Sequence, residues 1–146
     1  DEKKDGFLVN GMGIYSYDMS LGQRVFLAQF DAIKKIAENE SCVIVGRCAD
    51  YVLKDNSNVC NIFVCAPMDE KIERAVKYYG LNPQKAESQI LKMDKKRKGY
   101  YSFYTDRDWG KARNYDLCIN SKIGIDECVD AIAGYVKARF HLDENK

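Results

Sequence analysis

Residues 42–50 read Cys42-Val43-Ile44-Val45-Gly46-Arg47-Cys48-Ala49-Asp50, and this stretch decides the predicted fold. Its first four residues form a uniformly apolar run that ends at a glycine. Such a run is typical of a strand covered on both faces, as strands of parallel sheets are. Residues 61–65 form a second run of this kind, and residues 117–120 read as a third short strand. We therefore expect three strands of a parallel sheet.

Helical patterns alternate with these runs. Ser20 can cap a helix with apolar positions to Ala37, and a second helix from Met68 to Tyr79 stops at Gly80. Asn82 and Pro83 begin a third, in which Ala86, Ile90 and Met93 share a face before a basic segment and an aromatic-rich stretch to Arg113. Ile123 to Phe140 forms a closing helix. The alternation predicts an α/β fold, a single domain over residues 1–146, and ligands at the carboxyl ends of the strands.

Composition excludes several classes of function. The 23 Lys and Arg residues against 22 Asp and Glu leave a net charge of +1, so the charge of the whole chain does not favour nucleic acid or anionic membranes as partners. The apolar runs are too short to span a membrane. The six cysteines form no C-x-x-C pair, and with one histidine we interpret them as reduced core residues rather than metal ligands or disulfides. This usage predicts a cytoplasmic protein without a metal site.

Arg47 is the first candidate binding residue, because it directly follows an apolar run at the position where parallel sheets bind ligands. Gly46 would allow close backbone approach, and the guanidinium suits a phosphate. Asp50 brings a carboxylate to the same turn. The alternative is a strand-end arginine in a surface salt bridge.

A second cluster begins at Asp94 and continues through Lys95-Lys96-Arg97-Lys98. Asp94 and Arg97 would share one helical face, so a carboxylate and a guanidinium could address one ligand, for example the exocyclic amine of cytosine and a phosphate. The alternative is a solvated basic helix end. Aromatic residues between 100 and 109 could stack on single-stranded nucleic acid or close a mobile lid as a small satellite core.

A glycine-rich phosphate cradle is not recognisable in the sequence. Gly6 and Gly11 have the spacing of the first two glycines in G-x-x-x-x-G-K-[ST], but Met12 and Gly13 occupy the positions of its Lys and Ser/Thr. We therefore interpret residues 6–13 as a loop.

The ordered strings at 41–50, 61–76, 93–104 and 114–121 together resemble the cytidylate kinase-like family of P-loop kinases. The resemblance implies a three-layer architecture, a lid at about residues 94–113, and ATP-dependent phosphorylation of a nucleoside monophosphate, CMP or dCMP, with Mg²⁺. By this likeness Arg47 holds the acceptor phosphate, Asp94 and Arg97 match the Asp-x-x-Arg of the lid, and Lys96 and Arg97 neutralise charge during transfer. Arg74 matches a further family arginine that binds substrate.

The sequence departs from ordinary cytidylate kinases after the strand-end arginine, where Cys48 replaces an Asp and the carboxylate comes at Asp50. The family also places its first strand and P-loop before the segments seen here. The resemblance therefore predicts a segment upstream of Asp1. Two alternatives stay open: a kinase-like phosphotransferase with another small acceptor, and a non-catalytic binder of nucleotides or nucleic acid.

Overall fold

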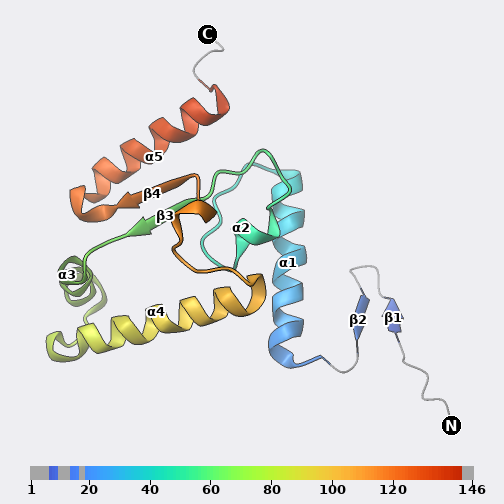
Figure 1. Cartoon of the computed structure of the whole chain (residues 1–146), viewed down its shortest axis with the longest axis horizontal. Helices are drawn as coiled ribbons and strands as arrows, with labels where there is room; N and C mark the ends of the chain where they lie inside the picture. Colours follow the sequence, from blue (N-terminus) through green and yellow to red (C-terminus); the bar gives the residue numbers. More distant parts are fainter. Residues whose placement is uncertain (1–6, 10–13, 17–18, 143–146) are drawn as a thin grey trace. The chain divides into compact units, whose positions relative to one another are not determined.

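The computed structural model of the chain describes residues 7–9, 14–16 and 19–142, in two compact units, Asp1–Leu53 and Lys54–Lys146. The single domain over residues 1–146 stays a prediction. The first unit contains the antiparallel strands β1 (Phe7–Val9) and β2 (Ile14–Ser16), the long helix α1 (Leu21–Asn39) and the short helix α2 (Ala49–Val52) (Figure 1). The loop predicted at residues 6–13 is wrong at residues 7–9, which form β1, and its other residues lie outside the described part of the chain.

Helix α1 begins where the sequence predicts. The Ser20 hydroxyl accepts a hydrogen bond from the Gln23 backbone N–H, and the Gln23 side chain accepts one from the Ser20 N–H. This reciprocal capping box satisfies two backbone donors that the first helical turn leaves without partners. Ile33 is buried, and α1 packs against α2 within the unit.

The strand predicted at residues 42–45 is wrong. None of the described strands pairs with this segment, which has no regular structure. Val43 is 94% exposed and Val45 is 89% exposed, so the apolar run is not covered on its faces. A strand is defined by hydrogen bonds to a neighbour, and the apolar character of a segment cannot supply that neighbour.

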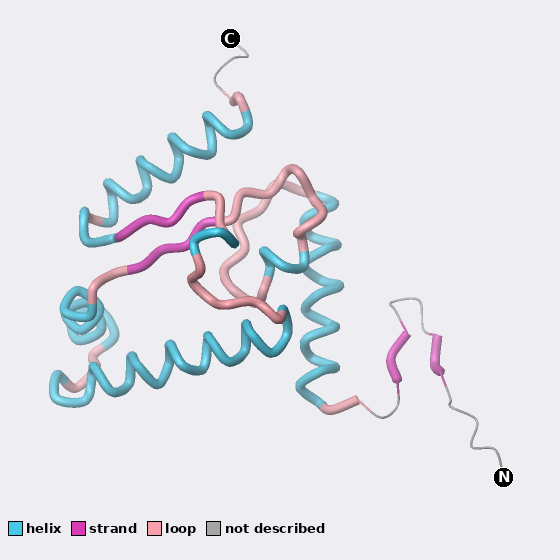
Figure 2. The backbone as a smooth tube through the Cα atoms, viewed as in Figure 1, coloured by secondary structure: helices cyan, strands magenta, loops and turns pink. Residues whose placement is uncertain are grey.

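The second unit is built on two parallel strands, β3 (Ile62–Cys65) and β4 (Leu117–Asn120), in the register Ile62↔Leu117. Next to this pairing the Asp116 backbone N–H donates to the Asn61 carbonyl at 2.8 Å, and the Asp116 carboxylate accepts a 2.7 Å hydrogen bond from the Asn61 N–H. The unit's helices are α3 (Met68–Tyr79), α4 (Pro83–Thr105) and α5 (Ile125–Phe140), with 3₁₀ turns η1 (Ala112–Asn114) and η2 (Ser121–Ile123). Figures 1 and 2 show α5 on one side of the strands and α4 on the other. The predicted α/β class, a parallel sheet flanked by helices, is confirmed.

The ends of α3 and α4 follow local sequence signals. Gly80 closes α3 in a left-handed conformation with φ +64°, which a glycine adopts without the strain of a Cβ. The Asn82 side chain accepts a hydrogen bond from the Gln84 N–H, and Pro83 occupies the first helical position of α4.

Helix α4 differs from its prediction in length and in its inner face. It continues through the basic and aromatic residues to Thr105, because Tyr101 and Thr105 are buried and extend its inner stripe. Met93 is half exposed and does not belong to that stripe. Asp94 takes the position instead, four residues after Ile90.

An aromatic cluster holds the loop after α4 against β3. Trp109 lies edge-on to Phe63 with ring centroids 5.4 Å apart, and Tyr115 lies 4.9 Å from the same ring. Gly110 has φ +76°, and a Cβ at this residue would lie 3.0 Å from the Phe63 ring. The loop can approach the strand this closely because residue 110 is a glycine.

The cysteines are not all core residues, as the sequence predicted. Cys48 and Cys128 are buried and Cys60 is half-buried, but Cys42, Cys65 and Cys118 are exposed. Among the described residues, no helix combines the length and apolar character needed to cross a membrane.

Candidate functional site

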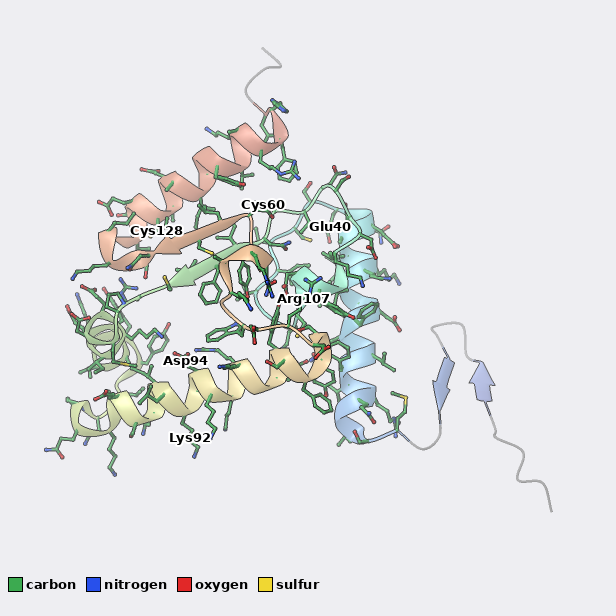
Figure 3. All side chains as sticks on the ribbon, in the orientation of Figure 1. Glu40, Cys60, Lys92, Asp94, Arg107 and Cys128 are labelled. Carbon is green, nitrogen blue, oxygen red and sulfur yellow. The ribbon has the colours of Figure 1, made fainter. Side chains whose placement is uncertain are left out.

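The candidate site of the second unit centres on Asp94, which lies on the inner stripe of α4. Figure 3 shows Asp94 on the side of α4 toward the strands, whereas Lys92 lies on the opposite side. A carboxylate half-buried in this way needs cationic partners, because burial without them disfavours its charge. Lys71 of α3 provides one, with its Nζ 2.6 Å from Asp94 Oδ2. Arg97 provides the other, with its Nη1 2.9 Å from Oδ1.

The electrostatics of the site favour a charged carboxylate. Burial raises the pKa of Asp94, but the hydrogen bonds and charges of Lys71 and Arg97 outweigh it and lower the pKa below its ordinary value. Asp94 is therefore ionised at neutral pH.

Exposure differs among the three side chains, from 20% for Asp94 and 33% for Lys71 to 57% for Arg97. One N–H of the Arg97 guanidinium reaches Asp94. Because a guanidinium carries five donors, Arg97 can hold Asp94 and still donate to an anion. The arrangement can therefore bind a ligand that combines a negative group with a hydrogen-bond donor.

Arg74 is engaged at the carboxyl ends of the two strands. Its guanidinium donates to Ser121 Oγ at 2.7 Å and to the Ser121 carbonyl at 2.6 Å, and it lies 3.6 Å from the Glu70 carboxylate. The Ser121 hydroxyl in turn donates to the Cys65 carbonyl at 3.0 Å. The network thus joins α3 to the ends of β3 and β4. Substrate binding by Arg74 stays a prediction, and its contacts here are structural.

Arg47 and Asp50 lie in the first unit, around a turn of unusual backbone conformation. Gly46, Arg47 and Cys48 all have positive φ, at 72°, 56° and 57°. Arg47 is exposed, and Asp50 lies in the first turn of α2. Left-handed conformations at non-glycine residues cost free energy and occur disproportionately at functional sites, which makes this turn a reasonable candidate.

Cys48, which stands where the family resemblance implies an Asp, is buried. Burial raises the pKa of its thiol to about 11, and the charge of Asp50 adds to this effect while that of Arg47 opposes it. The thiol is therefore protonated at neutral pH and cannot replace a carboxylate. Among the candidates of this turn, Asp50 alone can provide a negative charge.

The structure brings some predicted residues together and adds one. Asp94 and Arg97 form the predicted pair, and Lys96 is exposed on the same helix. Arg47 and Asp50 belong to the other unit, so the predicted cleft between Arg47 and the lid at 94–113 stays a prediction. Lys71 was not found from sequence, although a carboxylate four residues after Ile90, in an otherwise apolar stripe, is a signal that a cation must lie opposite.

The comparisons with known proteins show the family of this chain. The family model described as the cytidylate kinase-like family matches residues 2–123. A crystal structure of an uncharacterized protein from Eubacterium ventriosum ATCC 27560 is similar at 38% sequence identity and a TM-score of 0.75, over 82% of this chain and 68% of that one. No curated protein matches the sequence. Since the family match extends over most of the residues, from the first unit through β4, this chain belongs to the cytidylate kinase-like family.

Proposed function

We propose that this chain forms the acceptor side of an ATP-dependent phosphotransferase that phosphorylates a nucleoside monophosphate, CMP or dCMP. Family membership supports a kinase-like role. The observation that carries the proposal is the ionised Asp94 held beside Arg97 on the inner stripe of α4. The carboxylate can accept from the exocyclic amine of a cytosine, and the guanidinium can donate to a phosphate or carbonyl oxygen.

In the proposed reaction an oxygen of the acceptor phosphate attacks the γ-phosphorus of ATP, and the bond from that phosphorus to ADP breaks as the new one forms. Catalysis of this transfer consists mainly of positioning and charge neutralisation. Arg47 would hold the acceptor phosphate, with Asp50 beside it. Lys96 and Arg97 would neutralise negative charge as the lid closes, which also excludes water.

ATP and Mg²⁺ are the donor and the metal ion that the family implies. The described residues contain no group of three or more His, Cys, Asp or Glu side chains placed to hold a metal ion. The sequence also shows no G-x-x-x-x-G-K-[ST] cradle for the donor phosphates. The proposal names residues for the acceptor and for the charge of the transferred phosphate, and it names none for ATP or Mg²⁺.

The test is a coupled assay of ADP release by the full-length protein with CMP, dCMP, UMP and AMP as acceptors. We expect turnover stimulated by CMP or dCMP, and its loss in Arg47→Ala. Arg97→Ala should raise the acceptor KM about 10- to 100-fold, the equivalent of one lost charged hydrogen bond.

Lys92→Ala is the matched control, because Lys92 lies on the same helix but on the side away from the strands (Figure 3). It should leave both kinetic constants unchanged. Turnover with a different acceptor would replace CMP in the proposal, and a protein inert toward every monophosphate would refute it.

A further inference from the structure

We propose that Lys71 is a positioning residue of the acceptor site, which acts on the acceptor only through the Asp94 carboxylate. The inference rests on the proposed function and deepens it. Lys71 belongs to α3 and lies 23 residues before Asp94, outside the predicted lid. Each cation contacts a different oxygen of the carboxylate: Lys71 contacts Oδ2 and Arg97 contacts Oδ1.

These two contacts fix the orientation of the carboxylate. A carboxylate held by Arg97 alone could rotate about its side-chain bonds together with that flexible partner, because both residues project from the same helix three positions apart. Lys71 reaches the other oxygen from a different helix that packs against α4. The plane of the carboxylate is therefore set by two separate elements, which is the kind of preorganisation that a binding site requires.

Accessibility separates the roles of the two cations. Arg97 is more than half exposed, whereas Lys71 is mostly covered and has its ammonium on the half-buried carboxylate. A ligand that approaches Asp94 can therefore reach the guanidinium directly. Lys71 contacts the Asp94 carboxylate from α3. Its positive charge also keeps a negative charge at Asp94 favourable within the inner stripe of α4.

The alternative is that the Lys71–Asp94 ion pair only holds α3 against α4. Its loss would then lower the free energy of unfolding without a specific effect on the KM for the acceptor. Kinetics distinguish the two. We expect Lys71→Met to raise the KM for the acceptor about 10-fold, with kcat and the KM for ATP changed less than about 3-fold. Lys71→Arg should recover most of the acceptor affinity, because it restores a cation opposite Asp94.

A double-mutant cycle tests whether Lys71 acts through Asp94. In an Asp94→Asn background, Lys71→Met should cause less than about a 2-fold further change in the acceptor KM, since the group that Lys71 orients is then absent. Additive effects would mean that Lys71 contacts the acceptor by itself and would overturn the inference. Lys77→Met is the control, because Lys77 lies on the same helix and its ammonium packs over the Tyr78 ring instead.

Failure of the inference can be told apart from failure of the proposed function. Wild-type protein that turns over no monophosphate refutes the function, and the inference with it. Active wild-type protein whose acceptor KM is the same in Lys71→Met refutes the inference alone. Thermal unfolding of every variant, with and without CMP, confirms that the kinetics are measured on folded protein. If Lys71→Met does not fold, Lys71→Gln carries the test, because it removes the cation but keeps a polar side chain.

Discussion

Replacing Arg74 by methionine would remove the guanidinium that joins α3 to the ends of β3 and β4, while keeping a long side chain in its place. Two short hydrogen bonds would be lost, to Ser121 Oγ at 2.7 Å and to the Ser121 carbonyl at 2.6 Å. The Ser121 hydroxyl would keep its bond to the Cys65 carbonyl. The Ser121 carbonyl would lose its guanidinium partner at a residue that is buried.

The size of the effect follows from these contacts. Hydrogen bonds to charged groups each contribute about 1.5–3 kcal/mol. The Arg74 side chain is 27% exposed, so water can partly replace the lost donors, and two bonds from one guanidinium are not additive. We therefore expect Arg74→Met to lower the free energy of unfolding by about 2–4 kcal/mol. The contact with Glu70 is longer, at 3.6 Å, and Glu70→Gln keeps an oxygen that can face Arg74, so this change should cost no more than about 0.5 kcal/mol.

The assay is urea unfolding followed by circular dichroism, with the acceptor KM measured on the same variants. Ser121→Ala should destabilise by about 1–2 kcal/mol, and the double variant by less than the sum, because both changes remove the Arg74–Ser121 bond. Unchanged stability in Arg74→Met together with a tenfold higher acceptor KM would refute the structural role. It would instead support the substrate-binding role that the family resemblance implies.

Three further predictions concern single residues. Because burial raises the Cys48 pKa to about 11, iodoacetamide should alkylate this thiol at pH 8 on the order of 100-fold more slowly than in urea-unfolded protein. The stability that the protonated Cys48 thiol contributes should fall as pH rises from about 9 to 11, because the thiol ionises more readily in the unfolded chain. The pKa of Asp94 is lowered in the folded protein, so its ionised carboxylate stabilises the fold above the unfolded pKa near 3.9, and this stabilisation is lost as pH falls through the folded pKa. The difference in unfolding free energy between wild type and Asp94→Asn should therefore shrink on acidification. Gly110→Ala should cost about 2 kcal/mol or more in urea unfolding, because the new Cβ meets Phe63 at 3.0 Å and the backbone has positive φ. Gly80→Ala, which has positive φ but no neighbour within 4 Å, should cost less; equal losses would show that contact with Phe63 is irrelevant.

Local signals predicted the helices of this protein well. The capping box at Ser20, the Asn82-Pro83 start and the Gly80 stop each act within a few residues, so the information needed to recognise them lies in one short stretch of sequence. The strands at 62–65 and 117–120 were also found. The strand at 42–45 was not, because its apolar pattern resembles theirs but no described strand pairs with it. Pairing is a property of two segments and cannot be read from one.

The difference between local patterns and contacts of distant segments also explains which parts of the candidate site were predicted. Asp94 and Arg97 were predicted as a pair because three-residue spacing places both on one helical face. The partners of Asp94 and Arg74 on other elements, Lys71 and Ser121, lie 23 and 47 residues away. No local pattern reports such contacts. Arg47 likewise has a left-handed backbone conformation, with φ 56°. The sequence does not predict this conformation, because residues other than glycine seldom adopt it.

The difference between Met93 and Asp94 shows why apolar periodicity can mislead at the candidate site. Both positions continue the spacing of Ala86 and Ile90, and hydrophobicity alone favours the methionine. The fold turns the carboxylate inward instead and supplies two cations to hold it. Such an arrangement is a poor way to gain stability, because the desolvation of Asp94 and Lys71 offsets part of their attraction, and a well-packed apolar side chain would serve α4 at least as well. We therefore propose that Asp94, a charge placed against the apolar pattern of its own helix, serves to bind a ligand rather than to stabilise the fold.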